Sequence, residues 1–316
     1  MLIGESRAQL HERLRVERVL THGTLDAEHA RVLANDGFNG DLRLDRFVLA
    51  GQGAADAVMK LPHQQAAQEA FQYGLAREIG AAHLFAPVAL RGDHSAATAF
   101  VAGTEFGKAG VTDVATLEAA LRRGAAARSG ALEGAQLVQH TARVERQLIQ
   151  YLDYLTANDD RHNRNGMVAN DAATGVQMID HGAAGVGDLA PGRRRPFLRV
   201  DYQGDVGRTG RWRGFEKTVL EPDALAAIRQ LDSGTIRQIH AETVGAAPRP
   251  VGGGAFTALT HRYTSSSRYL ENVLRRHEFA KTHGFFEYIA PPGRFTFERE
   301  YLAITGFAKR VAALIR

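Results

Sequence analysis

Residues 158–182 read Asn158-Asp-Asp-Arg-His-Asn-Arg-Asn165, then Gly166-Met-Val-Ala-Asn-Asp-Ala-Ala-Thr-Gly175, then Val176-Gln-Met-Ile-Asp-His-Gly182. The middle of this stretch holds two short apolar runs separated by an Asp/Gly turn, a pattern that predicts a β-hairpin. A hairpin brings its outer ends together, so Asn165 and Asp180 are expected to lie close to one another. Asp160 precedes Asn165 by five residues and reaches the same point. The stretch therefore predicts one site built from two aspartates and an asparagine.

Side chains of this kind are typical of a magnesium site. Mg²⁺ prefers oxygen ligands, takes one or two carboxylates, and completes its shell with phosphate and water. A remaining aspartate can orient or deprotonate an attacking hydroxyl, as phosphoryl transfer requires. The alternative is that Asn and Asp only form turns here, but their spacing around a hairpin favours a site. His162 is either a metal ligand or a loop-bracing histidine; the second is favoured, because no third nitrogen or sulfur ligand has suitable spacing.

Both ends of the stretch resemble kinase motifs. Asp160-Arg-His-Asn-Arg-Asn165 is similar to the D-R-H-x-x-N catalytic loop of phosphatidylinositol 3-/4-kinases and HipA-like kinases, and Ile179-Asp-His-Gly182 is similar to their metal-binding I-D-x-G element. The resemblance implies a catalytic set of Asp160, Asn165 and Asp180. In it, Asp160 acts on the acceptor hydroxyl, while Asn165 and Asp180 hold Mg²⁺ and the donor is ATP. It also implies a two-lobed, protein-kinase-like α+β fold with a small β-rich N-lobe and a larger helical C-lobe.

The order of the other predicted elements agrees with that fold class. Strands are expected around residues 31–34, 41–49, 57–60, 88–90 and 97–101. Helices are expected over residues 5–20 and 63–80, from residue 112, and over 132–156, 222–231, 233–243, 265–282 and 297–315. Strands with one helix first and mostly helices later form an α+β pattern. We therefore divide the chain into a helical extension (1–27), an N-lobe (28–105) and a helical C-lobe (106–316).

Lysine is rare in this chain, so the position of each lysine is informative. Of 39 basic residues five are lysines, and Lys60, after an apolar run, is the only lysine among the first hundred residues. By the kinase resemblance, Lys60 contacts the ATP phosphates and Glu69, early in the next helix, holds it, with Glu78 as a second choice. Residues 100–105 resemble the hinge beneath the adenine, and residues 36–40 are the candidate phosphate-covering loop. The alternatives are a solvent-directed lysine at a strand end and an acid that is favoured only by the helix dipole.

A basic segment follows Asp180. Residues 191–217 hold eight basic and three acidic side chains, a net charge of +5 where the whole chain has +4. This segment is either a solvated loop or a surface for an anionic substrate, because arginine clusters suit phosphates and acidic peptides. Trp212 and Tyr202 among the arginines leave single-stranded nucleic acid as a third interpretation.

The composition excludes several classes of protein. Without cysteine there is no disulfide framework, thiolate metal site or thiol nucleophile. No stretch approaches the roughly 18 apolar residues of a transmembrane helix, and no signal-peptide pattern is evident, so a cytoplasmic protein is expected. We expect an ATP- and Mg²⁺-dependent kinase that phosphorylates a hydroxyl, on a protein in preference to a lipid. The alternatives are AMP transfer by the same residues, a catalytically silent nucleotide-binding protein, and a basic nucleic-acid-binding protein.

Overall fold

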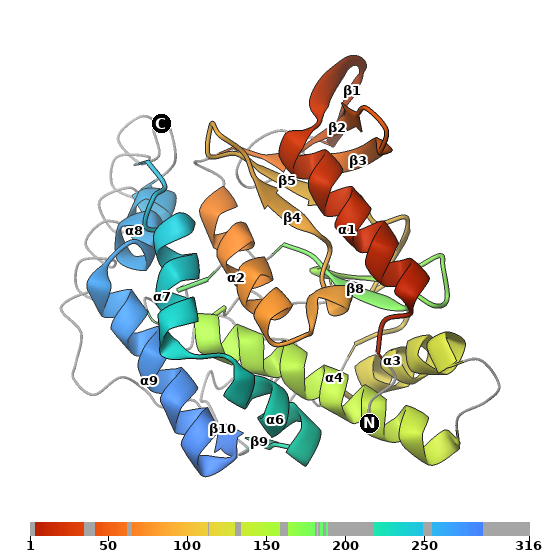
Figure 1. Ribbon diagram of the computed structural model, residues 1–316, viewed down its shortest axis with the longest axis vertical. Helices are drawn as coiled ribbons and strands as arrows, with labels where there is room; N and C mark the ends of the chain where they lie inside the picture. The colour runs from red at the N-terminus through yellow and green to blue at the C-terminus, as the bar shows by residue number, and fades with distance from the viewer. Residues whose placement is uncertain are drawn as a thin grey trace, which may run out of the picture.

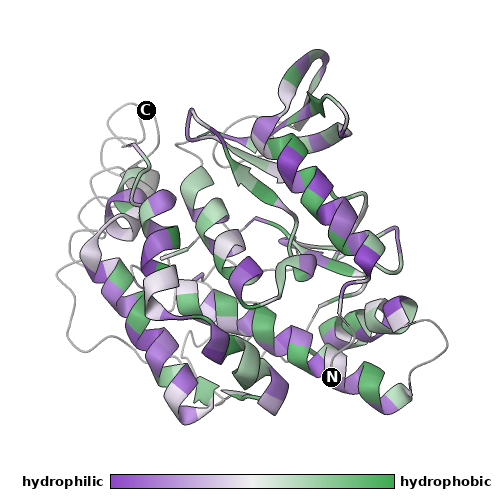
Figure 2. Ribbon diagram, in the orientation of Figure 1, coloured by the Kyte–Doolittle hydropathy of each residue, from purple (hydrophilic) through white to green (hydrophobic). Residues whose placement is uncertain are grey.

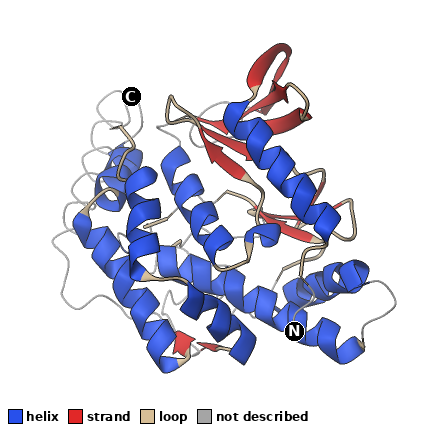
Figure 3. Cartoon of the chain, in the orientation of Figure 1, coloured by secondary structure: helices blue, strands red, loops and turns tan. Residues whose placement is uncertain are grey.

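The computed structural model describes residues 4–34, 42–61, 65–112, 114–129, 134–158, 164–180, 182, 184–185, 188, 218–248 and 255–286. Within these ranges the chain forms a β-rich part, which we call the N-lobe, and a helical part, the C-lobe (Figure 1, Figure 3). In Figure 3 the large sheet lies at the upper right and most helices lie below it. None of the helices in the described ranges is long and apolar enough to cross a bilayer.

The N-lobe is built on a five-stranded antiparallel sheet of order β1-β2-β3-β5-β4. Its strands are β1 (Thr24–Ala34), β2 (Leu42–Leu49), β3 (Gly53–Lys60), β4 (Val88–Leu90) and β5 (Ala96–Ala99). Ala55 and Ala57 of β3 are buried while their neighbours are more exposed, the alternation of a strand with one covered face. Helix α2 (Ala66–Glu78) and the short 3₁₀ helix η2 (Ala82–Leu84) connect β3 to β4.

Helix α1 (Arg7–His22) covers part of this sheet (Figure 1). Ser6 and Gln9 form a capping box at its start. Its buried Val19 and Leu20 pack in a small core with side chains from β2 and β3. In Figure 2 hydrophilic and hydrophobic residues alternate along α1, as expected for an amphipathic helix with one covered face.

The predicted hairpin is confirmed, and it belongs to a second sheet. Strands β7 (Gly166–Ala169) and β8 (Val176–Met178) pair antiparallel, and β6 (Gly103–Glu105) adds to β7. Asp171 accepts hydrogen bonds from the backbone and hydroxyl of Thr174 in the turn, at 3.0 and 2.6 Å. Gly175 has a φ of +67° and lies against the backbone of α3, so glycine is required there. Of the predicted hinge, residues 100–105, the first three connect β5 to β6 and the last three form β6 itself.

The C-lobe consists mainly of helices around the long, central α4. They are α3 (Val114–Ser129), α4 (Ala135–Thr156), α6 (Pro222–Gln230), α7 (Ser233–Glu242), α8 (Ala255–Thr264) and α9 (Ser267–His283), with a small sheet of β9 (Thr218–Val219) and β10 (Phe285–Phe286). Val144, Leu148, Leu152 and Leu155 of α4 are buried, at positions that share one helix face. The large core of the molecule forms around this stripe and the apolar face of α2.

The predicted fold class is confirmed: the chain is α+β, with a β-rich part and a larger helical part, as in a two-lobed, kinase-like fold. Several elements differ from the expectation: β6, β9, β10 and η2 were not expected, β3 begins at Gly53 rather than near residue 57, and β1 and α8 differ for reasons that the structure shows. β1 begins at Thr24 rather than near residue 31, because its polar first half is held by backbone pairing with β2 and shows no apolar alternation. α8 was not expected, since its sequence is rich in threonine, but packing of Leu259 and Tyr263 into the core offsets that weak helix propensity. The helix expected over residues 297–315 lies outside the described residues.

Candidate active site

Lys60 lies at the centre of the candidate site. It ends β3, opposite Ala96 of β5. Its Nζ donates to Asp180 Oδ1 at 2.6 Å and also to Glu69 Oε1. The Lys60 side chain is only 13% exposed, which excludes a solvent-directed lysine. Burial alone would lower the pKa of the Lys60 ammonium, but the carboxylates of Asp180 and Glu69 raise it above its ordinary value, so the side chain is charged.

Glu69 connects this lysine to helix α2. It lies in the first turn of α2 and is fully buried. Its Oε1 also accepts a hydrogen bond from the backbone N–H of Gly182 at 2.8 Å. Burial raises the pKa of the Glu69 carboxyl, and the Lys60 ammonium opposes that shift. Glu78, the second candidate, is exposed at the far end of α2, so Glu69 is the acid of this helix that contacts Lys60.

Gly182 lets the chain after β8 approach α2 closely. A Cβ at this position would lie 3.1 Å from Gln65 Cβ and 3.4 Å from Glu69 Oε1. Either contact is crowded or at the limit of normal van der Waals distance, so a side chain would push the backbone away from Glu69. The glycine of the I-D-x-G element therefore has a steric role here: it permits the hydrogen bond from its own N–H to Glu69.

The two ends of the hairpin meet, as predicted: Ile179, the neighbour of Asp180, pairs with Asn165. The backbone N–H of Ile179 donates to the carbonyl of Asn165 at 3.1 Å, and the next pair in the ladder is Gly166 with Met178. Asn165 is buried, whereas the side chain of Asp180 is 52% exposed. Asp180 has a φ of +55°, a left-handed conformation in which aspartate is more common than most residues. This end of the hairpin therefore carries one half-exposed carboxylate, of Asp180, and one buried amide, of Asn165.

The oxygen donors of Asp180 and Asn165 fit Mg²⁺, which accepts carboxylate and amide oxygens and takes further ligands from phosphate and water. Among the described residues no cluster of three or more His, Asp or Glu side chains is suited to hold a metal. A magnesium ion held by Asp180 and Asn165 would take further ligands from phosphate and water. Asp160, His162 and the basic segment 191–217 lie outside the described residues, so their predicted roles stay predictions.

A buried polar network below the site did not emerge from the sequence. Gln72 of α2 and Asn158 both donate to Asp153 Oδ1 of α4, at 2.9 and 3.2 Å. Through Asp153, these hydrogen bonds connect Asn158, at the start of the polar loop, to α2, the helix that carries Glu69. Its signal in the sequence is weak: polar residues at Gln72 and Asp153 interrupt otherwise apolar helix faces.

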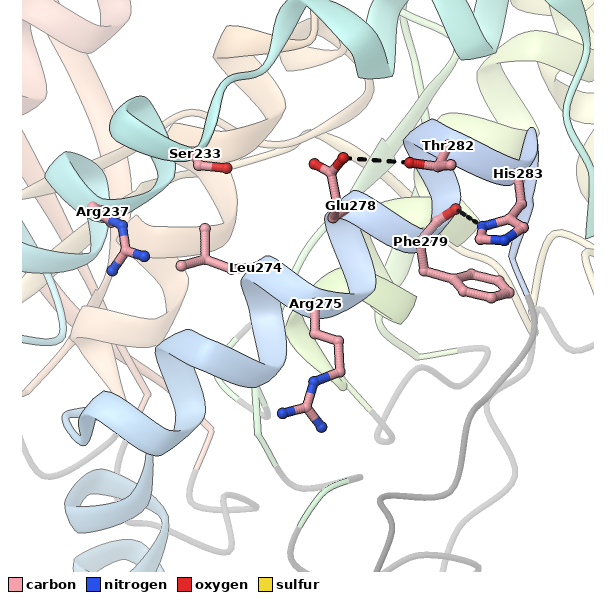
Figure 4. A pocket seen from close by; sticks show the side chains of 8 residues that line it. All are labelled: Ser233, Arg237, Leu274, Arg275, Glu278, Phe279, Thr282 and His283. Carbon is pink, nitrogen blue, oxygen red and sulfur yellow. Dashed lines mark hydrogen bonds between the residues drawn. The ribbon is translucent and has the colours of Figure 1, made fainter.

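A pocket of about 520 Å³ lies elsewhere, between the start of α7 and the second half of α9. Figure 4 shows Arg237 from α7 and Leu274, Arg275 and Phe279 from α9 along its wall. None of its lining residues belongs to the elements that carry Lys60 or the hairpin. This pocket is therefore separate from the candidate active site.

No protein-family model and no curated protein matches the chain. Among solved structures, the proinflammatory kinase CtkA of Helicobacter pylori is similar to it, with a TM-score of 0.39 and 12% sequence identity over 84% of this chain and 97% of that chain. A likeness at this level carries no argument about function, and we base the proposal below on the side-chain contacts.

Proposed function

We propose that this chain is an ATP-dependent phosphotransferase with a kinase-like site, which moves the γ-phosphoryl group to a hydroxyl. One observation supports the proposal above all: the Lys60 ammonium lies between the buried carboxylate of Glu69 and the half-exposed carboxylate of Asp180. A strand, a helix and a hairpin from both lobes supply these three groups. An ammonium held by one buried carboxylate beside a half-exposed one is suited to bind phosphate oxygens, and the exposed carboxylate would be available to a metal ion.

Each residue has a separate role in this proposal. Lys60 binds phosphate oxygens of ATP, and Glu69 fixes the position of the ammonium. Asp180 and Asn165 would hold Mg²⁺, which neutralises negative charge on the phosphates when bound. Asp160 accepts the proton of the acceptor hydroxyl as its oxygen bonds to the γ-phosphorus; the bond from that phosphorus to the bridging oxygen breaks, and ADP leaves. The proposed acceptor is a protein hydroxyl in preference to an inositol lipid.

Labelled ATP tests the reaction type. The chain is incubated with Mg²⁺ and ATP labelled at the γ- or the α-phosphate, and products are separated by mass. We expect transfer of the γ-label only. Transfer of the α-label would replace the proposal with AMP transfer. ATP binding without transfer would indicate a silent binding protein.

Lys60→Met tests the site itself. We expect turnover to fall by about 10²–10³-fold, the usual loss when one preorganised charge partner is removed. Lys108→Met is the matched control, because Lys108 is 75% exposed and, within the described ranges, its ammonium pairs with the carboxylate of Glu105 at 3.5 Å. Thermal melting checks that both variants fold. If Lys60→Met does not fold, the double variant Lys60→Met/Glu69→Gln is used instead, because it also removes the buried carboxylate that has lost its cation. Unchanged turnover in the folded variant would contradict the assignment.

A further inference from the structure

Arg276 of α9 contacts both segments that flank the candidate site. Its Nε donates to the carbonyl of Leu155 at 2.9 Å, and its Nη1 donates to Asp188 Oδ1 at 2.7 Å. Leu155 lies in the last turn of α4, just before the polar loop that begins at Asn158. Asp188 follows Asp180 by eight residues. The guanidinium of Arg276 therefore connects the end of α4, before the polar loop, to the segment that follows Asp180.

The ion pair of Arg276 and Asp188 is enclosed. The Asp188 side chain is 2% exposed and that of Arg276 is 12% exposed. Tyr263 of α8 donates its hydroxyl to the other oxygen of Asp188 at 2.9 Å, and Asn272 of α9 donates to that hydroxyl at 2.9 Å. Both carboxylate oxygens thus accept directed hydrogen bonds from α8 and α9. The planar guanidinium fork of arginine fixes the direction of its contacts, which a lysine ammonium would not.

Two further contacts join the same segments. The backbone N–H of Gly185 and the hydroxyl of Tyr269 both donate to the carbonyl of Thr156, at 2.7 and 3.0 Å. Gly185 has a φ of +81°, and a Cβ there would lie 2.7 Å from Thr264 Cγ2. The chain after Asp180 is therefore packed tightly between the end of α4 and helices α8 and α9.

We propose that Arg276 and Asp188 are positioning residues of the active site, which hold the end of α4 and the segment after Asp180 at a fixed separation. The inference rests on the proposed phosphotransferase function and extends it to the C-terminal helices. Apolar side chains of similar volume would fill this space with equal or greater stability than a buried ion pair. Apolar side chains would not fix the distance between the two segments, whose side chains act on the same phosphoryl group in the proposed reaction. Small displacements of reacting groups lower the turnover rate strongly.

Asp188→Asn and Arg276→Lys test this role. Asp188→Asn keeps the shape of the side chain and removes its charge, and Arg276→Lys keeps the charge and removes the planar guanidinium. We expect kcat to fall by about 10–100-fold with little change in the KM for ATP, since Lys60 and Glu69 stay in place. Amide hydrogen exchange should accelerate in peptides covering residues 152–158 and 179–185. The control is Glu145→Gln, which breaks the ion pair of Arg128 and Glu145. This pair is also buried, at 3% and 4% exposure, and among the described residues the Glu145 carboxylate bonds to Arg128 and His83, which lie outside both segments.

Thermal melting measures the folded fraction of every variant. An unchanged kcat in either folded variant, or an equal loss of kcat in the control, would overturn the positioning role and leave the proposed function standing. Absence of phosphotransfer in the unmodified chain would instead overturn the proposed function. The exchange measurement separates these cases, because it detects the release of the two segments without any turnover.

Discussion

Two buried glutamates, Glu69 and Glu145, show the same pattern of hydrogen bonds with different partners. In each, Oε1 accepts from two donors: Lys60 and the Gly182 N–H for Glu69, Arg128 and His83 for Glu145. In each, Oε2 is buried without a hydrogen-bond partner among the described residues. Burying a carboxylate in this way is unfavourable unless a cation stays beside it. Both clusters therefore fix the position of a positively charged side chain.

The two clusters differ in where that cation can reach. Arg128 is 3% exposed and His83 is 14% exposed, so every described member of the Glu145 cluster is largely shielded from solvent; we call this cluster closed. Lys60 instead extends from Glu69 to Asp180, whose side chain is 52% exposed. A closed cluster can only stabilise the fold, whereas an open one can exchange its exposed partner for a ligand. A solvent-exposed partner of the cation, here Asp180, therefore distinguishes a candidate site from a structural ion pair.

The largest effect is expected at the closed cluster. Glu145→Gln leaves the Arg128 guanidinium buried without its counter-ion, and we expect the free energy of unfolding to fall by about 3–5 kcal/mol. Urea denaturation measures this loss. Turnover per folded molecule should stay unchanged, because neither residue belongs to the proposed site. A stability equal to that of the unmodified chain would show that the two clusters do not differ as described.

The open cluster should respond in the opposite way. Asp180→Asn removes the exposed carboxylate, and we expect turnover to fall by about 10²–10³-fold through the loss of charge at the phosphates. Stability should change by at most about 1 kcal/mol, since an ion pair with a half-exposed partner contributes little. Turnover and thermal melting are measured on the same sample. A large loss of stability with full turnover would assign Asp180 to the fold rather than to the chemistry.

Acidification should give the smallest effect, and it acts on the C-lobe. Burial lowers the pKa of His240 and of His277 below the ordinary 6.5, so both are neutral in the fold while the unfolded chain takes up protons first. Their contribution is therefore complete above pH 6.5 and is lost as the pH falls from there toward their folded pKa values. Urea midpoints at about pH 7 and pH 5.5 measure the loss.

His277→Gln should reduce this pH dependence. An identical pH dependence in His277→Gln and the unmodified chain would contradict the role of the buried histidines.

The sequence by itself determined the hairpin and the meeting of its ends. Apolar runs on either side of an Asp/Gly turn favour one local pairing, and that pairing brings Asn165 opposite Ile179, the neighbour of Asp180. The scarcity of lysine and the strand before Lys60 singled out the side chain that contacts Glu69 and Asp180 in the structure. Helix periodicity was enough for α2 and α4, whose observed bounds lie within three residues of the predicted ones.

Only the tertiary structure decided which partners these groups have. Glu69 and Glu78 both lie on α2, and packing alone placed the first beside Lys60 and left the second exposed. Arg276 reaches Leu155 and Asp188 across 121 and 88 residues of sequence, a separation over which no periodicity or turn signal operates. The physical reason is that a buried charge takes the partner that the packed core brings within hydrogen-bond distance. Local spacing cannot specify that partner, because it depends on the contacts of the whole fold.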